Sequence, residues 1–197
     1  MSSNAIRTAD FLDRLRTDLQ TLRAITAKEF RPLTDEQLNR RPSPGKWSVG
    51  QCLEHLNIVG GHYLPSITQR LRRAKDSGSH PAEFTKFGPL GRRFVESMRQ
   101  DPATKALKTP QKFAPSGSRL PRTVVEVFSR QIDELLSLLE QAKEVNINSL
   151  RIPNAIIPLV RLRLTDQLEF LVAHMQRHVA QAERALASTV RPESARG

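Results

Sequence analysis

Hydrophobic side chains recur at intervals of three and four along four stretches of this chain, which is the spacing of one face of an α-helix. The first stretch covers residues 6–30 and the second covers residues 48–76. Their hydrophobic positions are Phe11, Leu12, Leu15, Leu19, Leu22 and Ile25 in the first, and Val49, Cys52, Leu53, Leu56, Val59, Tyr63, Ile67 and Leu71 in the second. Each stretch therefore predicts a long amphipathic helix.

Local signals mark the start of the second helix. Ser48 is followed three residues later by Gln51, which fits a capping box that satisfies backbone N–H groups of the first turn. Thr34 and Gln37 have the same spacing and predict a short helix further upstream. Pro65 lies inside the second helix, where we expect a bend because proline cannot donate a backbone hydrogen bond.

Two further amphipathic helices are predicted over residues 121–144 and 160–188. Their hydrophobic positions are Val124, Val125, Phe128, Ile132, Leu135, Leu136 and Leu139, and then Leu164, Leu168, Leu171, Val172, Met175, Val179 and Ala182. Residues 77–120 are rich in Pro, Gly, Ser and Lys, and we expect one short helix there, over residues 90–100. Residues 145–158 are predicted to be an irregular link.

Four long helices with little strand signal predict an all-α fold, a four-helix bundle in a single domain over residues 1–190. Residues 191–197 are predicted to form a flexible C-terminal tail. The long connection between the second and third helices gives them room to run parallel, whereas short connections would force antiparallel neighbours.

The overall charge narrows the classes of function. The chain has 197 residues and a net charge of +11, from 31 Lys and Arg against 20 Asp and Glu. The basic residues are scattered, and one Trp and one Tyr leave little for stacking on bases. The charge therefore predicts a solvated surface, and nucleic-acid binding ranks last among the functions considered.

The cysteine content and the N-terminus indicate the compartment. Cys52 is the only cysteine, so it has no partner for an internal disulfide, and we expect a small core residue rather than a catalytic thiol. The N-terminus has no hydrophobic signal core, and no hydrophobic run reaches the length of a membrane span. These features predict a cytoplasmic protein without membrane association.

Three histidines carry the candidate chemistry. His174 and His178 lie four residues apart, so both imidazoles project from one face of the fourth predicted helix. His55 lies at the edge of the hydrophobic face of the second helix, and we expect all three at the margin of the core, partly in contact with water. Three neutral imidazoles can hold a divalent ion and leave a fourth position for water or substrate.

Other interpretations of these residues stay open. A pair of histidines on a helix is more often an ordinary surface or core feature than a metal site. His62 lies two turns, about 10–11 Å, from His55 and is too far away to share an ion, and His80 lies in the long connection. Gln181 is expected either to orient a ligand or water or to make an ordinary interhelical hydrogen bond. Trp47 is expected to anchor the core at the start of the helix rather than to contact a substrate.

Two distant segments of the chain share features with one known family. Residues 33–63 contain the turn "PGKWS" (44–48), with His55 and Leu56 following eight residues after the Trp. Residues 166–186 contain the two spaced histidines and a following glutamine, and residues 108–116, "KTPQKFAPS", precede the third helix. Together these segments resemble the DinB-like (DinB/YfiT) superfamily of metalloenzymes.

The resemblance spans nearly the whole chain and implies both a fold and a metal site. It implies an up-down-down-up four-helix bundle. It also implies a divalent metal on His55, His174 and His178, most often nickel or zinc and otherwise manganese or iron. Proteins of this family include thiol-dependent transferases and isomerases, hydrolases and proteins without a known activity.

We therefore expect a metal-dependent hydrolase or thiol-dependent transferase that acts on a small molecule, either an anionic one or a low-molecular-weight thiol. No catalytic acid or base is assigned, because Glu54 points about 100° away from His55 on the helix. The alternative is a non-catalytic helical-bundle protein with a structural or partner-binding role. An exposed hydrophobic face of the bundle would favour a homodimer.

Overall fold

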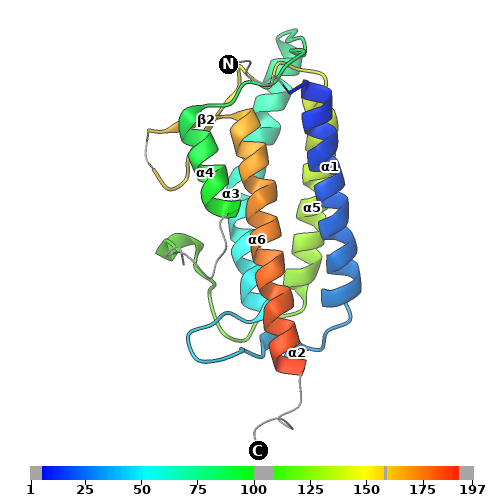
Figure 1. Ribbon diagram of the computed structural model, residues 1–197, viewed down its shortest axis with the longest axis vertical. Coiled ribbons are helices and arrows are strands. Elements are labelled where there is room, and N and C mark those ends of the chain that lie inside the picture. Colours follow the sequence, from blue (N-terminus) through cyan, green and yellow to red (C-terminus); the bar gives the residue numbers. More distant parts are fainter. Residues whose placement is uncertain (1–5, 100–108, 158, 191–197) are drawn as a thin grey trace, which may run out of the picture.

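The computed structural model describes residues 6–99, 109–157 and 159–190, so the tail predicted over residues 191–197 lies outside this part of the chain. The long helices are α1 (Thr8–Ile25), α3 (Val49–Asp76), α5 (Thr123–Ala142) and α6 (Leu164–Val190). Figure 1 shows them side by side along the long axis of the molecule. α3 packs against α5 and α6, and α1 packs against the same two helices. The fold is therefore mostly helical, as predicted.

Shorter elements connect the long helices. They are a π-helical turn that extends α1 (Thr26–Phe30), α2 (Asp35–Asn39), α4 (Pro89–Arg99), a 3₁₀ turn η2 (Gln111–Phe113) and the strands β1 (Arg151–Pro153) and β2 (Arg161–Arg163). α2 and α4 confirm the two short helices predicted from the sequence. α4 lies alongside α6, so the long connection covers one side of that helix (Figure 1).

The predicted capping chemistry fixes the start of α3. The Ser48 hydroxyl accepts a hydrogen bond from the Gln51 backbone N–H (3.2 Å), and the Gln51 side chain accepts one from the Ser48 N–H (3.1 Å). α3 then continues through Pro65 to Asp76. The backbone carbonyl that loses its donor there belongs to Gly61, and both residues are exposed to solvent, which can supply the missing hydrogen bond.

The β-hairpin is the main difference from the predicted elements. The prediction placed an irregular link over residues 145–158 and began the last helix at residue 160. Instead, β1 and β2 pair antiparallel, and α6 begins at Leu164. Ile152 and Leu162 are directly paired and both are buried, whereas the flanking residues are more exposed. A strand of three residues is too short for its alternation of polar and hydrophobic residues to stand out in a sequence.

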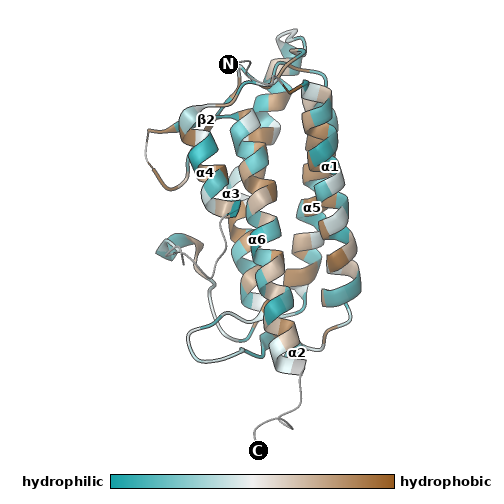
Figure 2. Cartoon of the chain, in the orientation of Figure 1, coloured by the Kyte–Doolittle hydropathy of each residue, from teal (hydrophilic) through white to brown (hydrophobic). Residues whose placement is uncertain are grey.

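One connected cluster of buried side chains joins the long helices. Phe11, Phe30 and Phe128 are its largest members, and each is fully buried. Cys52 belongs to the same cluster, as predicted, and burial raises the pKa of its thiol to about 12. Figure 2 shows both hydrophobic and hydrophilic residues on each long helix. In the described ranges, no helix combines the length and the hydrophobicity needed to cross a membrane.

α4 approaches the start of α6 very closely. The Asp166 carboxylate accepts hydrogen bonds from the Gly88 backbone N–H at 3.0 and 3.1 Å. Gly91 faces the same carboxylate, and a Cβ atom at that position would overlap the Asp166 side chain. The close contact between these two helices therefore depends on a residue without a side chain.

Candidate metal centre

The three predicted histidines converge at one point between α3 and α6. His55 comes from α3, while His174 and His178 come from successive turns of α6. One ring nitrogen of each lies within 4.8 Å of the others, and the His55 and His174 Nε2 atoms are 3.1 Å apart. Donors on a tetrahedral zinc ion, with bonds of about 2.0–2.1 Å, are separated by about 3.3 Å. The side chains are therefore already close to the spacing that a divalent ion requires.

The histidines lie deeper than their helix positions predicted. Only 4% of His55 and 7% of His174 is exposed, so the expectation of partial water contact is wrong for these two and holds for His178 alone. Two aromatic rings pack against the histidines of α6. The Phe170 ring stacks on His174 with centroids 5.5 Å apart, and the Trp47 ring stacks on His178 at 5.8 Å. The expected anchor Trp47 therefore packs against both the core and this site.

Hydrogen bonds to the second ring nitrogen orient two of the imidazoles. His55 Nδ1–H donates to the Phe113 backbone carbonyl (2.7 Å), and His178 Nδ1–H donates to the Gln181 side-chain oxygen (2.9 Å). With the proton on Nδ1, the lone pair that can bind a cation is on Nε2, and in His55 this atom accepts a hydrogen bond from His174 Nε2–H (3.1 Å). Such outer partners commonly fix the tautomer and the ring orientation of metal-binding histidines. Gln181 thus has the orienting contact that its spacing suggested.

Burial keeps the imidazoles neutral. It lowers the pKa of His55, lowers that of His174 well below the usual value, and lowers that of His178 to about 3. Repulsion between neighbouring imidazolium charges adds to the effect at His174 and His178. Protons therefore do not compete for the nitrogen lone pairs at neutral pH, which suits a cation site.

Ser116 and Gly117 of the long connection are hydrogen-bonded to α3 beside His55. The Glu54 carboxylate accepts hydrogen bonds from the Ser116 backbone N–H (2.8 Å) and hydroxyl (2.6 Å), and the Gln51 amide donates to the Gly117 carbonyl (2.9 Å). Glu54 therefore points away from the histidines, as its helix position predicted. These contacts span about sixty residues of sequence, and no local pattern of the sequence signals them.

A cavity of about 940 Å³ opens in front of the histidines. α3, α4, α6, the turn before Trp47 and the residues around Phe113 enclose it. This volume lies in the range that holds a small organic molecule. His62 and His80 are exposed and do not line the cavity, so neither shares the site, as expected.

Comparison with known proteins agrees with this arrangement. The family model of the DinB superfamily matches residues 18–182, a range that includes all three histidines. The uncharacterized protein YuaE of Bacillus subtilis (strain 168) is 25% identical over 161 residues, which cover 79% of this chain and 87% of that protein. No solved structure matched the chain. The resemblance found in the sequence is thus confirmed, and the chain belongs to the DinB superfamily.

Proposed function

We propose that this protein is a divalent-metal-dependent enzyme, with His55, His174 and His178 as the metal ligands and the adjoining cavity as the substrate site. The observation that carries the proposal is the convergence of three neutral imidazoles at the wall of a cavity. Three protein ligands leave part of the ion's coordination shell open, which is typical of catalytic rather than structural sites. Membership of a metal-associated superfamily supports the same conclusion.

The reaction we favour is hydrolysis or thiol-dependent group transfer on a small molecule, either an anionic one or a low-molecular-weight thiol. A bound ion would polarise the substrate and acidify a water or thiol. Among the described residues, none that lines the cavity is an Asp or Glu, so the side chains offer no carboxylate base. The protein's own contribution would be to orient His55 and His178 and to shield the site with Trp47 and Phe170. Nickel or zinc is the preferred ion, with manganese and iron as alternatives.

We also infer the up-down-down-up order of the long helices in one domain over residues 1–190. Ion pairs join Lys75 to Glu144, Arg14 to Glu169, Lys143 to Asp13 and Arg23 to Asp133. The first joins the C-terminal ends of α3 and α5, and the second joins the N-terminal halves of α1 and α6. The last two join the beginning of α1 to the end of α5, and the end of α1 to the middle of α5. These ion pairs support an arrangement in which α1 and α6 run in one direction and α3 and α5 run in the opposite direction.

The metal content of the tag-free protein, measured by mass spectrometry, tests the proposal. We expect about one divalent ion per chain, lost in the double variant His55→Ala/His174→Ala. The variant His62→Ala, which removes an exposed histidine of the same helix, should keep the ion. A wild-type protein that stays metal-free after incubation with nickel, zinc or manganese would favour the non-catalytic alternative.

A homodimer stays a prediction. Ile156, Ile157 and Leu159 are exposed in the loop between β1 and β2, and hydrophobic side chains of this kind can pack between subunits. Sedimentation equilibrium of the wild type and of Ile157→Lys would test whether these residues contribute.

A further inference from the structure

We propose that the cavity binds an organic anion with a hydrophobic body, its anionic group held by Arg184 and Lys46 and its body packed against the aromatic side chains beyond the histidines. This proposal rests on the proposed function, which places the reaction at the three histidines. It goes further by naming a substrate class with two chemically different ends.

The order of residues along α6 gives the cavity its direction. Phe170, His174, Arg177, His178, Gln181, Arg184 and Ser188 all line it and recur every three or four residues. At 1.5 Å per residue, the stretch from Phe170 to Ser188 extends about 27 Å. Because these side chains share one face of a straight element, their order in the sequence is their order along the cavity. The histidines therefore lie between the phenylalanine end and the arginine end.

The end near Phe170 is hydrophobic. Its ring packs against Phe94 of α4 with centroids 6.4 Å apart. Val59 and Tyr63 of α3 and Met98 of α4 complete this wall. The Tyr63 hydroxyl is already engaged by the Ala155 backbone N–H (3.0 Å), so the ring presents mainly carbon to the cavity. A hydrophobic or aromatic group of a ligand would be desolvated at this end.

The opposite end is basic. Arg184 of α6 lies at this end, and Lys46 comes from the turn before Trp47. Arg177 lies further along the same face of α6, between His174 and His178, and donates a hydrogen bond to the Met98 backbone carbonyl (3.4 Å). Ser43 and Ser188 add hydroxyl groups at the same end.

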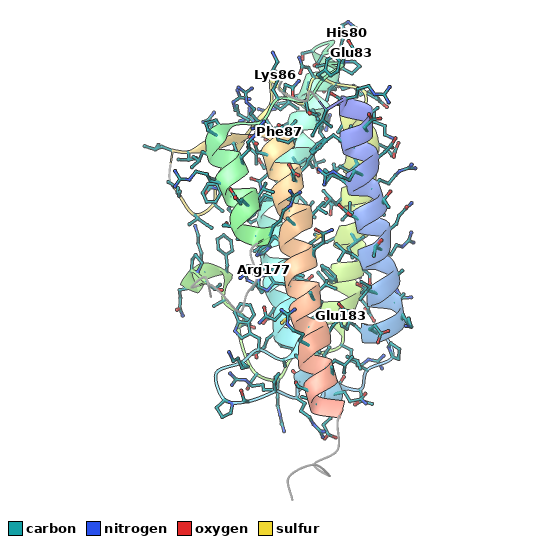
Figure 3. All side chains as sticks on the ribbon, viewed as in Figure 1. His80, Glu83, Lys86, Phe87, Arg177 and Glu183 are labelled. Carbon is teal, nitrogen blue, oxygen red and sulfur yellow. The ribbon has the colours of Figure 1, made fainter. Side chains whose placement is uncertain are left out.

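No acidic side chain in the described part of the chain lines this end of the cavity. The Glu169 carboxylate is paired with Arg14 (2.9 Å) and Arg99 (2.6 Å), and Figure 3 shows Arg177 and Glu183 on different sides of α6. None of the described cavity-lining residues is acidic. A cavity walled by one sign of charge attracts ligands of the opposite sign. The arrangement therefore selects an anion over a neutral or cationic molecule of the same shape.

Fluorescence of Trp47 tests the proposal, because it is the only Trp of the chain and lines the cavity. Metal-free protein is titrated with 4-phenylbutyrate, its neutral amide 4-phenylbutyramide, the cation 4-phenylbutylamine, and butyrate. We expect the phenylbutyrate to bind about tenfold more tightly than the amide, since hydrogen bonds to charged groups are stronger than neutral ones. The amine and butyrate should bind more weakly still.

Variants with matched charge locate the anionic end. Arg184→Gln should remove most of the preference for the carboxylate over the amide. Arg72→Gln removes the same charge from an exposed ion pair on α3 and should leave the preference intact. Circular dichroism checks that both variants fold, and the probe series on the wild type decides the question if Arg184→Gln does not.

Several results would overturn the inference. They are equal affinity for the carboxylate and the amide, tighter binding of the amine, and butyrate binding as tightly as phenylbutyrate. Absence of binding by all four probes would also overturn it. Because the titrations use metal-free protein, they are independent of the metal-content measurement. A failure of the metal site and a failure of the substrate class can therefore be told apart.

Discussion

The imidazole of His178 is stacked on Trp47, and its pKa is lowered to about 3, mainly by burial. In the unfolded chain a histidine titrates near pH 6.5. The unfolded state therefore binds more protons between these two values, and stability decreases as the pH falls through this range. We expect the urea midpoint of the metal-free protein to fall from pH 7 to pH 5, and by less in His178→Gln. The exposed-residue variant His80→Gln should follow the wild type, and a wild-type pH dependence in His178→Gln would contradict the assignment.

The hydrogen bond from His178 to Gln181 makes a second prediction at the residue scale. Gln181→Leu removes the acceptor that keeps the proton on Nδ1, so zinc affinity should fall by about 10–100-fold, as is usual for outer partners of metal ligands. Competition with a chromophoric chelator measures this affinity. Gln176→Leu alters an exposed glutamine of the same helix and should bind zinc normally. Equal affinity in both variants would remove the orienting role of Gln181.

At the scale of elements, the contact between α4 and α6 depends on Gly91. A Cβ atom there would overlap Asp166, so Gly91→Ala should lower the free energy of unfolding by about 1–3 kcal/mol. Gly61→Ala in α3 is the matched control, because a Cβ atom at Gly61 meets no other atom within 4 Å. A helical alanine in place of glycine should raise stability there by up to about 1 kcal/mol. Urea denaturation of both variants measures the difference, and a shift in the same direction would contradict the close contact.

The sequence predicted elements best where the determinants are local. The capping box at Ser48, the hydrophobic faces of the long helices and the pair His174 and His178 are all patterns within a few residues. The hairpin of β1 and β2 was missed because each strand has three residues and is defined by its pairing with the other strand, not by a pattern within its own residues. The burial of His55 was underestimated for a similar reason, since the cover that Phe113 provides comes from 58 residues away.

At the scale of the whole molecule, the histidine cluster joins two segments separated by 119 residues. An ion that binds this cluster binds the folded chain in preference to the unfolded one, and it should stabilise the protein by about 2.7 kcal/mol at 100 times its Kd. For a chain of this size, that corresponds to a rise in Tm of about 5–10 °C. Differential scanning fluorimetry with and without zinc measures the shift. His55→Ala should abolish it, and a similar shift in that variant would place the ion elsewhere.

The fold also brings together basic residues that are scattered along the sequence. The basic residues are scattered along the sequence, and the net charge of +11 predicted a solvated surface and an anionic substrate without locating a binding site. Folding brings Lys46 together with Arg184 at one end of the cavity. Lys46 and Arg184 lie more than one hundred positions apart in the sequence, so no sequence window could show that they share a site.

The segment around Phe113, which is held against α3 by the hydrogen bonds from Ser116 to Glu54, affects the thermodynamics of metal binding. The Phe113 carbonyl can accept from His55 only when the proton is on Nδ1, which is the tautomer with the cation-binding lone pair on Nε2. Docking of this segment and metal binding therefore favour the same state of one imidazole, and the two equilibria are linked. If docking of the segment raises the metal affinity by some factor, a bound metal raises the equilibrium constant for docking by the same factor. An ion bound by the three histidines and the docked wall of the cavity would therefore each raise the affinity of the protein for the other.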